Sequence, residues 1–96
     1  MKQVIEGKRY DTETAEYLAT YEYGYLGDLG YVWEALYHTK KGAFFLAGEG
    51  GANTSYARET GRNSWTAGKA IHPLPPDDAQ SWLEDHAPDV VARLFP

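Results

Sequence analysis

The sequence predicts an α+β domain with a small, mainly antiparallel sheet around a central hairpin at residues 31–47, packed against an N-terminal and a C-terminal helix. Residues 31–39 are rich in aromatic and branched side chains, which is typical of a strand. The Lys-Lys-Gly step at 40–42 suits a hairpin turn, and Pro76 followed by two aspartates suits the first turn of a helix. A length of 96 residues fits one domain spanning residues 1–96.

The N-terminal third is predicted to hold a short strand, a helix and a loop. Residues 4–6 favour the short strand. Asp11 or Thr12 suits an N-cap, so we expect a helix that runs from there to about Tyr21. The apolar stripe of this helix consists of Ala15, Leu18 and Ala19. Three glycines at three-residue spacing then end the helix and make residues 23–30 an adaptable loop.

The predicted hairpin has strands at residues 31–39 and 43–47 that are apolar on both faces, so we expect it in the centre of the sheet. The glycine-rich residues 48–52 are predicted to break the sheet after the second strand. The segments that follow are a short helix at 53–61, a polar loop at 62–68 and an edge strand at 69–72.

The C-terminal helix has the clearest start signal in the sequence. Pro76 occupies the first helical position, and Leu74 is placed to pack on Ala79 as a hydrophobic staple. Pro88 is predicted to end this helix. Residues 90–95 add an apolar turn that folds back on the domain.

The formal charge of −5 is distributed unevenly. Residues 1–34 carry three bases and seven acids, residues 35–70 five bases and two acids, and residues 71–96 one base and five acids. The two acidic ends favour a basic partner. Only the middle of the chain offers the positive charge that nucleic acid requires.

The composition also restricts chemistry and location. The chain has no cysteine, which excludes thiolate nucleophiles and thiolate metal sites. It has no apolar run of signal-peptide or membrane-span length, so we expect a cytoplasmic protein without membrane contact.

Catalytic, metal and cofactor sites are not expected. The three histidines lack the spacing of a zinc site, and no serine has a nucleophile-elbow context. The glycines at 48–51 are not followed by the Lys-Ser or Lys-Thr pair of a phosphate loop, and Glu49 would repel phosphate. We therefore expect a binding protein without enzymatic activity, small-molecule substrate or cofactor.

Tyrosines and acids alternate along one stretch of the chain. Seven of the eight tyrosines fall between Tyr10 and Tyr37, together with six acids. Exposed rings beside carboxylates suit a lysine- or arginine-rich surface, through cation–π contacts and ion pairs. The residues expected to contact a partner are Tyr21, Glu22, Tyr23, Tyr25 and Asp28, with Glu13 and Glu16 of the predicted first helix.

Two other functions remain open. A nucleic-acid-binding accessory protein would use a basic patch, and the residues available for it are Lys40, Lys41, Arg58, Arg62 and Lys69. A structural or regulatory protein would act as a homo-oligomer. We expect a monomer or a homodimer.

The order of motifs resembles a family of small, mostly uncharacterised proteins encoded by phages, prophages and other mobile elements. The motifs that carry the resemblance are residues 7–15 (GKRYDTETA), 36–42 (LYHTKKG), 48–52 (GEGGA) and 71–74 (IHPL), followed by Trp82-Leu83-Glu84. This chain departs from the pattern at Pro75-Pro76, where a serine and an acidic residue are expected.

In size and acidity the chain also resembles anti-CRISPR inhibitors. That resemblance implies a protein in the cytoplasm of a host bacterial cell that binds a CRISPR effector at its basic DNA-recognition surface. The expected effector is of type I (Cascade). Carboxylates of the inhibitor would stand in for DNA phosphates, and target DNA binding would be blocked. Direct binding of the protein to nucleic acid is then not expected.

Overall fold

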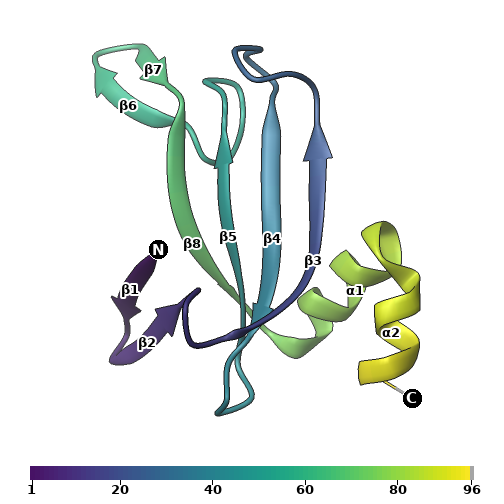
Figure 1. Ribbon diagram of the computed structural model, residues 1–96. Helices are drawn as coiled ribbons and strands as arrows, with labels where there is room; N and C mark the ends of the chain where they lie inside the picture. Colours follow the sequence, from purple (N-terminus) through teal and green to yellow (C-terminus); the bar gives the residue numbers. More distant parts are fainter. Residues whose placement is uncertain (96) are drawn as a thin grey trace.

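The main sheet has four antiparallel strands in the order β3-β4-β5-β8 within residues 1–95, the part of the chain that the computed structural model describes (Figure 1). Its strands are β3 (Glu16–Tyr23), β4 (Val32–His38), β5 (Phe44–Gly50) and β8 (Gly68–Leu74). Two smaller hairpins pair β1 (Lys2–Ile5) with β2 (Lys8–Asp11) and β6 (Arg58–Gly61) with β7 (Ser64–Thr66). The chain then forms helices α1 (Pro76–His86) and α2 (Pro88–Leu94). The predicted α+β class is confirmed.

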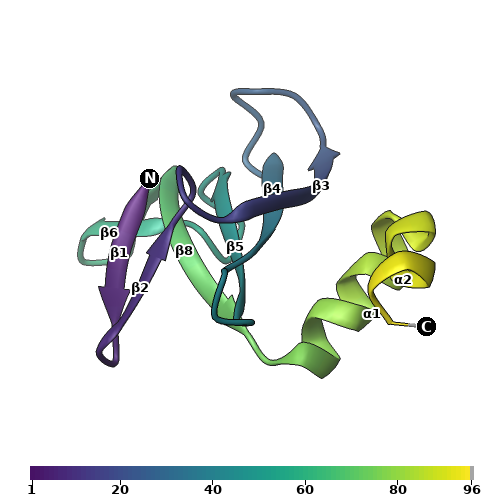
Figure 2. The same ribbon diagram turned by 60° about the horizontal axis from the view of Figure 1, so that its bottom comes forward.

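The helices and the β1–β2 hairpin lie on opposite faces of the main sheet (Figure 2). On the helix face, Leu36 and Leu46 pack with Leu83 of α1. On the other face, Phe45 and Tyr10 of β2 meet edge to face, with ring centroids 5.4 Å apart. Successive residues along β5 thus belong to two separate cores, because successive side chains of a strand point to opposite faces.

The predicted hairpin corresponds to β4 and β5, which pair along their whole length. Gly42 in its turn has a φ of 94°, a left-handed conformation that glycine adopts without strain. The predicted arrangement around the hairpin is wrong, since no helix precedes it and both helices follow the sheet. The segment Gly48–Gly50, expected to break the sheet, continues β5 instead.

The predicted N-terminal helix is also wrong, because this segment forms β3. The register of β3 against β4 shifts between Tyr17 and Ala19. This β-bulge buries the neighbouring side chains of Leu18 and Ala19 together. With Ala15 they give the spacing of a helical stripe, while the tyrosines and threonine around them favour a strand.

The short helix predicted at residues 53–61 is absent. Residues 58–61 form β6, which pairs with β7 inside the polar loop predicted at 62–68. The β6–β7 turn places Asn63 at a φ of 59°, a left-handed conformation that asparagine tolerates better than most residues. The C-terminal helix follows the prediction, since α1 has Pro76 in its first turn and Ala79 fully buried. Within residues 1–95 no helix is long and apolar enough to cross a membrane.

Candidate functional site

Large apolar side chains are exposed at one end of the main sheet, where β3 ends and the loop of residues 24–31 begins. The described residues expose eight large hydrophobic side chains, and five of them lie at this end. These five, which we call the loop-end surface, are Tyr23 (62% exposed), Tyr25 (81%), Leu26 (83%), Leu29 (60%) and Trp65 (55%). Scattered exposed apolar residues are common, but a contiguous group marks a binding surface.

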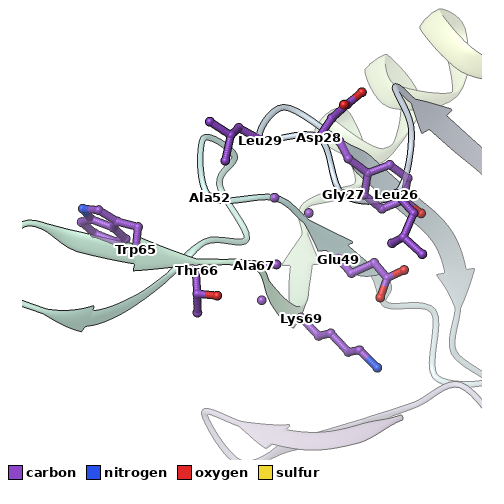
Figure 3. Close-up of a pocket in the computed structure, with 14 residues that line it drawn as sticks. Leu26, Gly27, Asp28, Leu29, Glu49, Ala52, Trp65, Thr66, Ala67 and Lys69 are labelled. Carbon is purple, nitrogen blue, oxygen red and sulfur yellow. The ribbon is translucent and has the colours of Figure 1, made fainter.

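A groove of about 370 Å³ runs between the loop and the β6–β7 hairpin (Figure 3). Leu26 and Leu29 line it on the loop side, and Trp65 lines it on the β7 side. Charged side chains of both signs, Asp28, Glu49 and Lys69, complete the lining. The groove is therefore apolar at its walls with a small number of charges, which is the usual composition of a ligand-binding groove.

The loop wall is fastened to the chain after β5. The Gly51 N–H donates to the Tyr31 carbonyl at 2.8 Å, and the Asn53 N–H donates to the Leu29 carbonyl at 2.9 Å. A Cβ at Gly51 would clash with the carbonyl oxygens of Asp28 and Leu29, so only glycine allows this approach. Gly51 thus serves close backbone packing.

The face of the sheet that carries the β1–β2 hairpin has a second hollow next to the groove. Register places Glu22, Trp33, Glu49 and Lys69 side by side across all four strands. With Tyr31 they line a hollow of about 340 Å³. Burial, and then the charges of Glu49 and Glu22, raise the pKa of Tyr31. Two carboxylates therefore lie close to one phenol on this face.

The structure separates the contact residues predicted from the sequence. Tyr23, Tyr25 and Asp28 lie at the loop end, where the Asp28 carboxylate accepts the Tyr25 N–H at 3.1 Å. Tyr21 is half-buried instead, with its ring stacked 3.9 Å from that of His86. Glu22 points to the opposite face from its neighbouring tyrosines, because β3 is a strand.

The other two predicted contact residues, Glu13 and Glu16, are exposed but far from this surface. Glu13 lies in the turn before β3 and Glu16 begins that strand. Seven residue steps of a strand separate Glu16 from Tyr23, which is roughly 23 Å. These two acids therefore do not join the loop-end surface.

The predicted basic patch is divided as well. Lys40 and Lys41 lie in the β4–β5 turn, at the opposite end of the sheet from the loop end (Figure 1). Arg58 begins β6, Arg62 lies in the β6–β7 turn, and Lys69 belongs to β8 near the groove. The five cations do not form one surface.

Glu34 holds a polar cluster on the helix face that the sequence did not indicate. Its carboxylate accepts the Tyr56 hydroxyl at 2.5 Å and the Trp82 indole N–H at 3.1 Å. The Tyr56 ring stacks on His72 with centroids 4.7 Å apart and lies against Gly48, where any Cβ would clash with it. Because both carboxylate oxygens are engaged, the cluster joins α1 and the loop before β6 to the sheet.

Tyr56 should make this cluster sensitive to alkali. Burial, followed by the hydrogen bond to Glu34 and its charge, raises the pKa of Tyr56 above the ordinary 10.0. The stabilising contribution is therefore complete below about pH 10 and declines above it, as the unfolded tyrosine ionises. We expect the stability advantage of the wild type over Tyr56→Phe to shrink by about 1.4 kcal/mol per pH unit above pH 10, measured by urea unfolding.

Tyr25→Phe is the control, because that ring is 81% exposed. Its stability should run parallel to that of the wild type over the same pH range. Parallel curves for Tyr56→Phe as well would contradict the buried hydrogen bond.

Among residues 1–95, no group of three His, Cys, Asp or Glu side chains is arranged to hold a metal ion. Comparisons with family models, curated proteins and solved structures give no match to this chain. The fold and the site thus define a small α+β domain with an exposed apolar groove at one end of its sheet.

Proposed function

We propose that this protein is a non-catalytic binding protein that docks on a protein partner through the loop-end surface. The observation that carries the proposal is the gathering of five largely exposed apolar side chains at one end of the sheet, three of which, Leu26, Leu29 and Trp65, line one groove. Tyrosine and tryptophan are enriched in protein–protein interfaces because they combine a large rigid surface with a polar group. Leu26 and Leu29 lie on a loop that is hydrogen-bonded to the chain after β5, so the loop loses little conformational freedom on binding.

We further propose that the partner is a CRISPR effector, of type I, bound at its basic DNA-recognition surface. The net charge of −5 supports a basic partner. Glu22, Asp28 and Glu49 lie in or beside the groove and supply the local negative charge. The choice of a CRISPR effector rests on the resemblance in size and acidity to anti-CRISPR inhibitors.

In this proposal the inhibitor acts by occupation. The apolar side chains supply contact area, while the carboxylates of Glu22 and Glu49 take positions that DNA phosphates would fill. Trp33, between these two acids on the sheet, offers a ring face to a lysine or an arginine of the partner. Target DNA is then excluded without any chemical step.

The test is a pull-down of the tagged protein with purified type I effector complex, followed by a gel shift with target DNA. We expect binding that abolishes the shift. The double variant Tyr25→Ala/Leu29→Ala should bind at least about tenfold more weakly, because interface aromatics and their neighbours dominate affinity. Val4→Ala, an exposed apolar residue on β1, should bind like the wild type.

Equal binding by the double variant would refute the loop-end surface as the contact site. Failure to bind any effector, together with salt-sensitive retention of bare DNA or RNA, would favour the nucleic-acid-binding alternative.

A further inference from the structure

A third cavity lies between the β1–β2 hairpin and the β4–β5 turn. This turn is at the opposite end of the main sheet from the loop of residues 24–31 (Figure 1). Its volume is about 570 Å³. The residues that line it are Gly7, Lys8, Arg9, Tyr10, Thr14, Thr39, Lys40, Lys41 and Ala43. Four of the chain's nine lysines and arginines are in this set, and none of its 14 acids is. This concentration of charge is opposite in sign to the protein as a whole.

Two hairpins distant in sequence bring these cations together. On β2, Lys8 lies on the same side as Tyr10, which is buried against Phe45, so Lys8 faces the main sheet. Arg9 shares the outer side with the exposed Val4 and lies at the rim. Because β1–β2 packs through its own core cluster, the position of Lys8 is set by the fold.

The β4–β5 turn that carries Lys40 and Lys41 is firmly closed. The Gly42 N–H donates to the Thr39 carbonyl at 3.0 Å, and the Ala43 N–H donates to the Thr39 hydroxyl oxygen at 3.0 Å. The Thr39 hydroxyl hydrogen is therefore left to donate elsewhere. The lysines extend from a rigid base toward the cavity that they line.

Like charges held together in this way repel one another, and a soluble acidic protein gains nothing from the repulsion. A bound anion with several negative charges would remove it. The volume lies within the usual range for small-ligand sites. The ring of Tyr10 is 6% exposed, so it is not available for stacking on a base.

We propose that this cavity binds phosphate groups, with Lys8, Lys40 and Lys41 as the main charge partners and Arg9 at the rim. Lysine ammonium groups bind phosphate as point charges, and the Thr39 hydroxyl adds a neutral donor. The phosphates come from a phosphorylated small molecule or from the backbone of a nucleic acid. Recognition is independent of base sequence in either case. The site is separate from the loop-end surface and does not depend on the proposed partner.

The experiment is calorimetric titration with sodium tripolyphosphate, and thermal unfolding in its presence at fixed ionic strength. We expect saturable binding and a higher melting temperature than in sodium chloride alone. Lys40→Ala/Lys41→Ala should bind at least about tenfold more weakly. Both side chains are exposed, so this variant keeps its fold. The matched control Lys2→Ala/Arg93→Ala removes the same charge from exposed sites outside the cavity and should bind within about twofold of the wild type.

A parallel titration with a 15-nucleotide oligo(dT) distinguishes the two phosphate sources. Displacement of the oligonucleotide by tripolyphosphate would assign the site to a nucleic-acid backbone, whereas binding of tripolyphosphate alone would assign it to a small phosphorylated ligand. The proposal is overturned if neither anion binds, if sodium chloride raises the melting temperature equally, or if the control variant loses as much affinity.

Discussion

Leu83→Ala is expected to lower the free energy of unfolding by about 4 kcal/mol, the largest effect of any single substitution considered for this protein. Leu83 of α1 is completely buried and packs with Leu36 and Phe44 of the sheet. Truncation would leave a cavity where the helix meets the sheet, and neighbours close such cavities only in part. A domain of this size has a total stability of about 5–15 kcal/mol, so a large fraction would be lost.

Urea unfolding monitored by tryptophan fluorescence and far-UV circular dichroism measures this loss. Leu26→Ala makes the same chemical change at a side chain that is 83% exposed, and should alter stability by less than about 0.5 kcal/mol. If the two leucine variants were equally stable, α1 would not pack on the sheet as described.

The second large effect is expected for Glu34→Ala, at about 3 kcal/mol. The substitution leaves the Tyr56 hydroxyl and the Trp82 indole N–H without their acceptor. Tyr56 is only 3% exposed, so water does not readily replace the carboxylate. The penalty for an unsatisfied buried donor is larger than the net gain from making the hydrogen bond.

Thermal unfolding should show a fall of more than about 10 °C in the melting temperature of Glu34→Ala. Glu34→Gln retains one carbonyl acceptor and should lose about half as much stability. Glu22→Ala, on the neighbouring strand but exposed, is the matched control and should remain close to the wild type. A Glu34→Ala protein as stable as this control would mean that the cluster contributes nothing to the fold.

The elements predicted correctly from the sequence are those in which local signals and tertiary packing agree. The hairpin strands and the start of α1 at Pro76 follow from aromatic content, turn glycine and helix-start chemistry. The N-terminal segment was mispredicted because the β-bulge buries two neighbouring residues, Leu18 and Ala19. A bulge interrupts the alternation of a strand and is set by pairing with β4, which the sequence does not display.

The β6–β7 hairpin was missed for a different reason. Its residues are almost all exposed, so they carry no apolar alternation. Asn63 in the turn was the available signal, because asparagine favours a left-handed turn position.

For the candidate site, the sequence indicated the right region but only part of the surface. Tyr25 and Asp28 do lie there. Tyr21 instead packs against His86 of α1. Leu26 and Leu29 were overlooked, although leucines between closely spaced glycines have few neighbours to bury them. The contribution of Trp65 depends on the missed hairpin.

The two walls of the groove differ in how they are held, and this difference bears on the speed of complex formation. The loop wall is tied by backbone hydrogen bonds to residues after β5, while β6 and β7 are exposed except for the half-buried Thr66. Elements with so little buried surface move at low free-energy cost. A partner would find the loop wall already in place, whereas the β6–β7 wall would still have to move into contact. The observed rate constant for association should then level off at high partner concentration. Its limit would be the rate constant for the movement of the hairpin.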